Sequence, residues 1–259
     1  MDLGLKGRKA LVCASSQGLG FACAAALARE ACVVFINGRD PSKLATAAGE
    51  LRSATRATII EVPADLNTEA GRATLIAACP DPDILVNNNA GPPAGRMADW
   101  DRAAWAAAIE ANMLAPIFLI QALLPGMRQR GFGRIVNITS AMVKSPESAM
   151  GLSTACRTAL TAFSKAVQRE AVADNVTINN LLPERFDTGR QRYMADRMMA
   201  SDGISREEAV ARIVETIAAK RFGRPEELGD SCAFICSAQA GFMSGQNIQL
   251  DGGSYRGLL

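Results

Sequence analysis

The stretch Lys9-Ala-Leu-Val-Cys-Ala-Ser-Ser-Gln-Gly-Leu-Gly20 decides the fold, because it joins a short apolar run to a glycine-bearing turn and an Ala-rich segment. The run Lys9–Cys13 predicts a β-strand, and Gly18–Glu30 predicts a helix. Glycines at such a turn let backbone N–H groups approach a pyrophosphate, which the positive N-terminus of the helix attracts. The pattern therefore predicts a nucleotide-binding strand–turn–helix unit at the start of the chain.

The same alternation of apolar β-rich runs and Ala-rich stretches continues through the chain. It predicts strands over 32–37, 58–62, 84–88, 134–139, 176–182 and 247–250, and helices over 41–55, 68–79, 99–130 (one long helix or two), 152–174, 206–220 and 225–237. Strands that alternate with helices indicate right-handed crossovers and a parallel sheet covered on both faces. We therefore predict that residues 1–259 form a single-domain, Rossmann-like α/β protein, a doubly wound parallel sheet of seven strands flanked by helices on both faces.

Composition excludes several classes of protein. The net charge of +2 does not favour a nucleic-acid partner, and the complete lack of histidine removes Ser-His triads and His-ligated metals. Seven cysteines, mostly in apolar runs, indicate reduced thiols rather than a disulfide framework. The longest apolar stretch, Met113–Leu124, carries Pro116 and Gln121, and the first residues form no apolar run. We therefore expect a cytoplasmic protein with no membrane partner and no bound metal.

The end of the second predicted strand bears on cofactor choice. A dinucleotide-binding fold that prefers NAD places a carboxylate here, where it binds the ribose diol and repels the 2′-phosphate of NADP. In this chain that place is Gly38, followed by Arg39, with Ser15 and Ser16 in the facing loop. A guanidinium with hydroxyls suits a phosphate, so the sequence favours NADP(H) over NAD(H). The alternative is that Arg39 is an ordinary solvated loop residue.

The segment Arg134-Ile-Val-Asn-Ile-Thr-Ser140 is followed, thirteen residues after its serine, by Ser153-Thr-Ala-Cys-Arg157. This frame resembles the catalytic segment of the short-chain dehydrogenase/reductase family, and in particular its 3-oxoacyl-ACP-reductase-like members. In that family a serine is followed at this distance by Tyr-x-x-x-Lys. Ser140 matches the serine, and Asn112 matches the family's helix-borne asparagine. Ser153 and Arg157 stand at the tyrosine and lysine positions, so the active site is atypical.

Further motifs extend the resemblance over nearly the whole chain. Gly18 and Gly20 match the family's Thr-Gly-x-x-x-Gly-x-Gly, with Cys13 and Ala14 in its first two places. The fourth strand carries one extra residue before Ala90-Gly91, which allows a bulge and leaves either Asn87 or Asn88 to make the structural hydrogen bonds. The resemblance implies cofactor binding by Ser15, Ser16, Gly18, Leu19, Gly20, Asn37, Arg39, Asp65, Leu66, Asn89, Ala90, Gly91, Arg157, Pro183 and Thr188.

The two substitutions change the implied chemistry. In the family the serine holds a carbonyl oxygen, the tyrosine protonates it, hydride arrives from the nicotinamide, and the lysine holds the ribose and lowers the tyrosine pKa. An aliphatic hydroxyl is far less acidic than a phenol of pKa ~10, so Ser153 is a poor direct acid, although it can hold a water. Arg157 can still donate to ribose hydroxyls but does not shuttle protons. We therefore expect cofactor binding to survive and the proton step to be slowed, by roughly 10²–10⁴-fold.

Three residues are candidate replacements for the missing acid. Tyr193 lies in 184–220, the region that resembles the family's substrate lid, and Lys144 borders the substrate site. Glu184 follows Pro183, where the family usually has glycine. The alternatives are a packing contact for Tyr193, an exposed loop position for Lys144 and a disturbed cofactor site around Glu184. Cys156, beside Arg157, is expected to be a core thiol.

Three functions remain open. The sequence favours an NAD(P)(H)-dependent oxidoreductase acting on a small-molecule carbonyl or alcohol; the alternatives are a catalytically impaired nucleotide-binding scaffold and a reductase of an activated double bond. The lid arginines at 185, 190, 192 and 197 would suit an acidic substrate with an apolar body, but we favour exposed arginines on an amphipathic helix. Family members are mostly tetramers joined through their two long helices, so we expect a homotetramer, with a dimer as the alternative.

Overall fold

Seven strands form one wholly parallel sheet in the computed structural model, which describes residues 1–258. The strand order is β3-β2-β1-β4-β5-β6-β7, with the switch point between β1 and β4. The strands are β1 (Lys9–Val12), β2 (Val33–Gly38), β3 (Ile59–Pro63), β4 (Ile84–Asn87), β5 (Gly133–Ile138), β6 (Val176–Pro183) and β7 (Asn247–Leu250). Their ends differ from the predicted ones by at most one residue, and the predicted fold class is confirmed.

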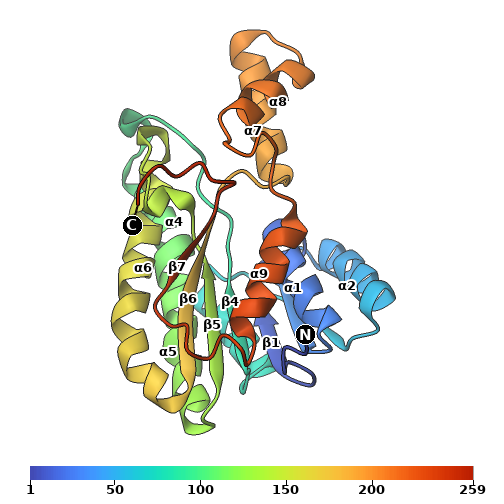
Figure 1. Cartoon of the computed structure of the whole chain (residues 1–259). Coiled ribbons are helices and arrows are strands. Elements are labelled where there is room, and N and C mark those ends of the chain that lie inside the picture. Colours follow the sequence, from blue (N-terminus) through green and yellow to red (C-terminus); the bar gives the residue numbers. More distant parts are fainter. Residues whose placement is uncertain (259) are drawn as a thin grey trace.

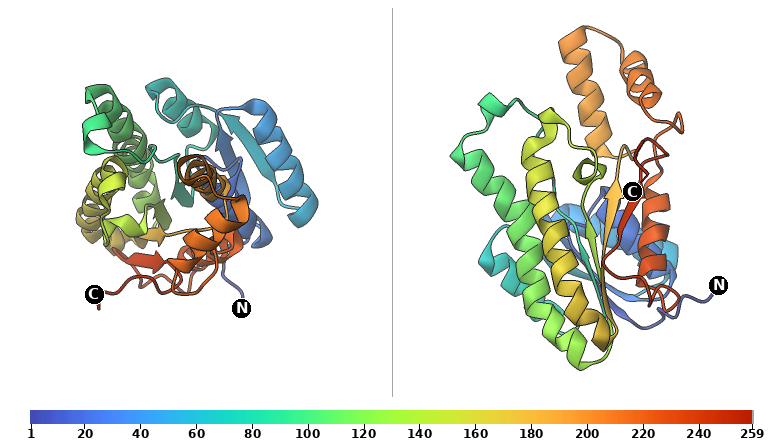
Figure 2. Two further views of the ribbon diagram at one scale, coloured as in Figure 1. Left: turned by 90° about the horizontal axis from the view of Figure 1, so that it is seen from above. Right: turned by 60° about the vertical axis from the view of Figure 1, so that its left-hand side comes forward.

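Helices cover both faces of the sheet (Figures 1 and 2). One core contains residues of α1 (Gly18–Arg29), α2 (Pro41–Thr55) and α9 (Pro225–Cys236); the other contains residues of α3 (Glu69–Ala78), α5 (Ala115–Gln129) and α6 (Gly151–Ala171). Successive strand residues alternate between the two cores, so that Val136 packs in the first and Ile135 in the second. Both faces are apolar because both are buried, as expected of a parallel sheet.

The segment predicted as one long helix or two is a helical run with a π turn inside it. It comprises α4 (Arg102–Ile109), the π turn Glu110–Leu114 and α5. The run 102–129 is long and apolar enough to cross a membrane by length and composition alone. In the structure its Leu119, Ile120, Leu123 and Met127 are buried in the core beneath the sheet, which accounts for its apolar character. The π turn carries Asn112, and such turns often lie at functional sites.

Two helices extend beyond the C-terminal ends of the strands (Figure 1). They are α7 (Gly189–Asp202) and α8 (Arg206–Glu215), which pack through a small apolar cluster around Ala195, Ala209 and Ile213. The helix predicted over 206–220 ends at Glu215, five residues earlier than predicted. No bounds for α7 were predicted from the sequence. The pair occupies most of the region 184–220, and it stands over the edge of the sheet where parallel α/β folds bind ligands.

Four asparagines form a hydrogen-bonded row across the sheet. Asn87, Asn137, Asn180 and Asn247 occupy matching positions on β4, β5, β6 and β7. Each amide nitrogen donates to the next oxygen along the row, at 2.9, 2.9 and 2.8 Å. Asn137 also donates to Ser164 Oγ of α6 at 3.0 Å. The row fixes the register of the strands and the position of α6 just below the ligand-binding edge.

The extra residue of the fourth strand does not form a bulge in its paired part. Pairing stays in step from Ile84↔Arg134 to Asn87↔Asn137. The added residue is therefore taken up in the turn that follows. Both candidate asparagines make structural hydrogen bonds, Asn87 within the row and Asn88 through its Nδ2 to Ala14 O at 3.2 Å.

We predict that Asn137→Leu lowers the free energy of unfolding by about 3 kcal/mol, because it leaves the amide of Asn87 and the amide oxygen of Asn180 buried without partners. Asn247→Leu removes only one bond at the partly exposed end of the row and is expected to cost about 1 kcal/mol. Urea unfolding followed by circular dichroism measures both. Equal decreases in the free energy of unfolding for the two variants would show that Asn137 is not the centre of a buried hydrogen-bond network.

Candidate active site

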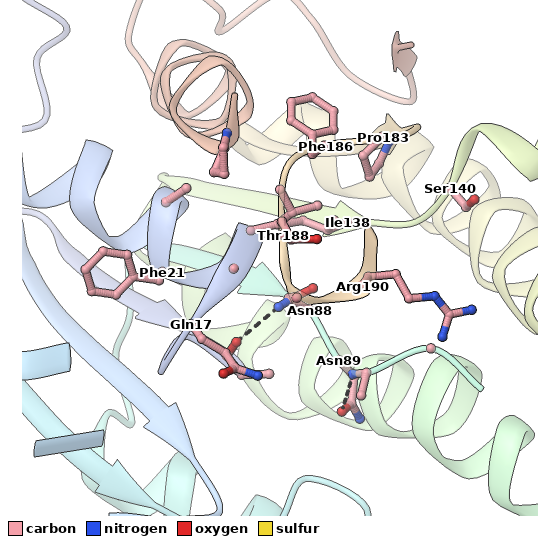
Figure 3. Close-up of a pocket in the computed structure, with 18 of the residues that line it drawn as sticks. Gln17, Phe21, Asn88, Asn89, Ile138, Ser140, Pro183, Phe186, Thr188 and Arg190 are labelled. Atoms are coloured by element: carbon pink, nitrogen blue, oxygen red, sulfur yellow. Dashed lines mark hydrogen bonds between the residues drawn. The ribbon is translucent and has the colours of Figure 1, made fainter. Parts of the chain in front are cut away.

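A cleft of about 910 Å³ opens at the C-terminal ends of the strands (Figure 3). Its walls come from the β1–α1 turn, the ends of β2, β4, β5 and β6, and the start of α7. Most of the predicted site residues line it: Ser16, Gly18, Leu19, Asn37, Arg39, Asp65, Leu66, Asn89, Ala90, Gly91, Ser140, Ser153, Arg157, Pro183 and Thr188. Residues that lie far apart in the sequence are thus gathered around one space.

Three predicted residues do not line this cleft, for physical reasons. Ser15 is fully buried; its Oγ donates to Val12 O and accepts from Asn37 N. Its side chain therefore stabilises the β1–α1 turn on the side away from the cleft. Gly20 is buried within the helix start. Asn112 lies behind Arg157, lining a separate small cavity of about 20 Å³. The amide of Asn37, although it reaches the cleft wall, is committed to Ala14 N and to the carbonyls of Val62 and Ala64.

The β1–α1 turn is shaped for close approach by a ligand. A Cβ on Gly20 would lie 2.4 Å from Ala14 O and 2.7 Å from Asn88 Nδ2, so only glycine fits. The first turn of α1 has no side-chain cap and no acidic residue. Its N–H groups are therefore available to an anion, as a pyrophosphate-binding helix N-terminus requires. Ala14 adopts a left-handed φ of 45°, which shows that the turn keeps its shape although its first glycine is absent.

The end of β2 provides a basic pocket without a carboxylate. Gly38 is buried, and a Cβ there would lie 3.1 Å from Ser16 Oγ. A longer side chain at this position would therefore push against the Ser16 loop. Arg39 is exposed on the cleft wall, and among the described residues it makes no ion pair. The guanidinium and the Ser16 hydroxyl are both free to meet a ligand here.

Ser140 lies just beyond β5 with its hydroxyl directed by the backbone. Its Oγ accepts a hydrogen bond from Met142 N at 3.2 Å. This leaves the O–H proton free to donate to a ligand oxygen in the cleft. Ser153, in the first turn of α6, is only 2% exposed but its side chain still borders the cleft. The two hydroxyls therefore lie on the same wall.

Arg157 spans three elements at the floor of the cleft. Its Nη1 donates to Thr139 O at 2.8 Å, beyond the end of β5, and its Nη2 donates to Asn112 Oδ1 at 3.0 Å, in the π turn. Gly91 permits this, because a Cβ there would lie 3.3 Å from Nη2. Burial, with a smaller contribution from the nearby Arg190, lowers the pKa of Arg157 to about 10. The guanidinium therefore remains a cation at neutral pH.

The three candidate acids have different positions. Glu184 lines the cleft, whereas Lys144 and Tyr193 do not. Lys144 Nζ lies 5.5 Å from the centre of the Tyr255 ring, and Tyr193 is 43% exposed beside Arg190. Burial raises the pKa of the Glu184 carboxyl; Arg185 opposes the rise, and Asp251 and Glu147 add to it. Of the three candidate acids, Glu184 alone therefore lines the cleft.

Other features of this wall were not predicted from the sequence. Arg185 adopts a left-handed φ of 54° directly after Glu184, and strained residues of this kind cluster at functional sites. Arg190 was named only as a lid residue, but its charge acts on Arg157. No local pattern reports such proximity, because the two arginines come from different elements. Cys156 is buried, and burial raises its pKa above the usual value, as expected of a core thiol.

Comparison with known proteins defines the family. A family model described as enoyl-(acyl carrier protein) reductase matches residues 13–255. Dehydrogenase/reductase SDR family member 4 of Bos taurus is 32% identical over 255 residues, covering 96% of this chain and 88% of its own. The oxidoreductase YvaG of Bacillus subtilis is 30% identical over 261 residues and 99% of each chain. L-sorbose reductase of Gluconobacter frateurii, solved with NADPH and L-sorbose, superimposes with a TM-score of 0.95 at 28% identity over 100% of both chains. The chain belongs to the short-chain dehydrogenase/reductase family of oxidoreductases.

We predict that Arg157→Lys, although it introduces the residue that the family motif carries, lowers the free energy of unfolding by about 1–2 kcal/mol. A single ammonium does not reproduce the two divergent hydrogen bonds to Thr139 and Asn112. Arg197→Lys, at an exposed position of α7, should change it by less than about 0.5 kcal/mol. Chemical denaturation of both variants provides the comparison. An unchanged or increased stability of Arg157→Lys would mean that the guanidinium does not hold these elements together.

Proposed function

We propose that this protein is an NAD(P)(H)-dependent oxidoreductase that reduces a carbonyl group of a small molecule, or oxidises the corresponding alcohol, and that it favours NADP(H). The observation that carries the proposal is the single cleft that joins the open α1 N-terminus to Ser140, Arg157 and Glu184. The similarity to an L-sorbose reductase that was solved with NADPH supports the same cofactor here.

The residues present fit a dinucleotide. The β1–α1 turn, with Gly18 and Leu19, would hold the pyrophosphate, and Ser16 with Arg39 would hold a 2′-phosphate. Asp65, with the turn Asn89–Gly91, would border the adenosine half, while Pro183 and Thr188 would border the nicotinamide. Arg157 keeps further N–H groups that would reach ribose hydroxyls. When bound, the reduced nicotinamide supplies a hydride to the carbonyl carbon.

We propose that Glu184 supplies the proton that the family's tyrosine would otherwise give. Ser140 donates a hydrogen bond to the carbonyl oxygen and polarises it. The protonated carboxyl of Glu184 then gives its proton to that oxygen, directly or through a water held by Ser153. The side chain of Glu184 is 20% exposed, so the carboxylate regains a proton from solvent. Burial favours its neutral form, which is the form a general acid needs.

A scaffold with little turnover is the second candidate. It is favoured by the near-complete burial of Ser153 and by the hydrogen bonds that already engage Arg157. The two functions differ in the fate of bound NADPH, which a scaffold leaves unoxidised with every carbonyl or activated alkene offered.

We also propose a homotetramer joined through the exposed sides of α4, α5 and α6, which sedimentation velocity would test against a dimer.

Arg39→Gln is expected to weaken NADPH binding about tenfold and to leave NADH binding unchanged, because a charge-assisted bond to the 2′-phosphate contributes on the order of 1.5 kcal/mol. Fluorescence titration of both cofactors measures the effect. Lys43→Gln, an equal loss of charge at an exposed site on α2, is the control. Parallel losses for NADPH and NADH in the Arg39 variant would overturn the assignment of this pocket.

Glu184→Gln is expected to lower kcat for carbonyl reduction by roughly 10²–10⁴-fold. In the unchanged protein the rate should be level at low pH and fall as pH rises through the elevated pKa of Glu184, because the acid form is the active one. The Gln variant should lose that fall. Glu147→Gln should retain most of the rate and move the fall to lower pH, since the charge of Glu147 raises the pKa of Glu184. A fall that persists in Glu184→Gln would assign the proton to another group.

A further inference from the structure

We infer that Arg157 and Arg190 together form a carboxylate-binding subsite in the cleft, so that the substrate is a carbonyl compound that carries an anionic group and an apolar portion. The inference deepens the proposed function and rests on it for the carbonyl chemistry. The presence of the anion subsite itself can be tested without turnover, both with and without bound cofactor.

Arg157 carries a partly buried charge that has no counterion among residues 1–258. Both of its hydrogen-bond acceptors are neutral, the carbonyl of Thr139 and the amide of Asn112. In residues 1–258 it forms no ion pair, and the charged or ionisable groups that act on it are Arg190 and the Cys156 thiol. A buried guanidinium is costly unless an anion meets it. This charge lies at the floor of the cleft, where a ligand can reach it.

Arg190 brings a second unpaired guanidinium to the same space. It is half-buried near the start of α7, and its Nη2 donates to Pro92 O at 3.3 Å, again a neutral acceptor. Figure 3 shows its side chain extending across the cleft in the region between Asn89 and Ser140. It too forms no ion pair with any described residue. Two like charges held near each other repel, and an anion between them would relieve that repulsion.

No acidic residue in the described part of the chain forms an ion pair with Arg157 or Arg190, although Asp65, Glu147, Glu184, Asp187 and Glu226 line the same cleft. Glu184 Oε1 lies 3.7 Å from Arg185 Nε, and burial favours the neutral form of this carboxyl, so Glu184 does not serve as a counterion for Arg157 or Arg190. Glu147 and Asp251 act on Glu184, and neither acts on Arg157. The two guanidinium groups therefore lack a carboxylate partner within ion-pair distance among the described residues. A carboxylate is the ligand that guanidinium groups bind with directed, paired hydrogen bonds.

The surroundings of the pair favour an apolar body on the anion. Met142, Met150 and Met194 line the same cleft, from the loop after β5, the start of α6 and α7. Flexible thioether side chains adapt to irregular apolar groups. Ser153, one turn before Arg157, is small and leaves the guanidinium accessible from the cleft. The sequence alone favoured solvated lid arginines, but the burial of Arg190 and its action on Arg157 distinguish it from exposed Arg192 and Arg197.

The test uses 2-oxohexanoate and its neutral methyl ester as probes, titrated calorimetrically into the protein with and without saturating NADP⁺, which permits no reduction. We expect the oxo acid to bind at least about tenfold more tightly than the ester, and added salt to weaken only the acid. Arg190→Gln and Arg157→Gln should each remove most of this difference. Arg197→Gln, on the same helix but outside the cleft lining, should preserve it.

Several outcomes would overturn the inference. Equal affinity of the acid and the ester would overturn the anion subsite, and so would an unchanged preference in Arg190→Gln, whose folding circular dichroism would check. Competition between the oxo acid and NADP⁺ would assign the arginines to a cofactor phosphate instead. Failure of NADP⁺ to bind would contradict the proposed function, whereas the titrations without cofactor would still decide the subsite.

Discussion

The rest of the site depends on the two hydrogen bonds that the Arg157 guanidinium makes beneath the cleft. They join the end of β5, the π turn and α6, which are otherwise separate parts of the chain. Gly91 leaves room for the guanidinium, since a Cβ there would lie 3.3 Å from Arg157 Nη2, and Asn112 presents its amide oxygen from the π turn. A fork-shaped cation meets this geometry because its N–H groups diverge in one plane. The floor of the cleft is therefore built around a fixed positive charge.

Arg157 and Glu184 line the same cleft but differ in their ionisation. Burial shifts both groups toward their neutral forms, lowering the pKa of Arg157 and raising that of Glu184. Arg157 nevertheless stays charged near neutral pH. The raised pKa of Glu184 lets its carboxyl keep a proton at higher pH than an exposed glutamate, so that it can donate this proton to a substrate. Separate environments can thus assign an electrostatic role to one group and an acid role to the other. In our account the two residues divide the tasks that a tyrosine–lysine pair performs in the family.

Much of the fold follows from local patterns in the sequence. Apolar runs of strand length and the glycine turn before α1 predicted all seven strands within one residue, because a buried parallel sheet requires such runs. The row of asparagines was missed, because each member lies on a different strand and only the register brings them together. The separate α7 was also missed, because its polar, arginine-rich sequence carries little apolar periodicity, and the end of α8 was placed five residues too late.

The site was predictable where a side chain follows the end of a strand, since the C-terminal ends of parallel strands converge. Arg39 was found in this way, while Ser140 and Pro183 were placed by the family resemblance, and all three line the cleft. Ser15 and Asn112 were placed in the site by motif, but the structure directs their side chains behind its wall. The choice among Lys144, Tyr193 and Glu184 needed three-dimensional information, because distance along the chain does not report which group faces the cleft. The nearness of Arg157 and Arg190 needed it for the same reason.

The central claim is that this cleft performs hydride chemistry with its own residues. The most direct measurement is a single turnover of NADPH deuterated at the transferable position, with protein in excess over an oxo acid, followed by mass spectrometry of the organic product. We expect a hydroxy acid that carries deuterium at the former carbonyl carbon, formed slowly but stoichiometrically. Recovery of unchanged oxo acid and deuterated NADPH from a complex that demonstrably binds both would contradict it and favour the scaffold.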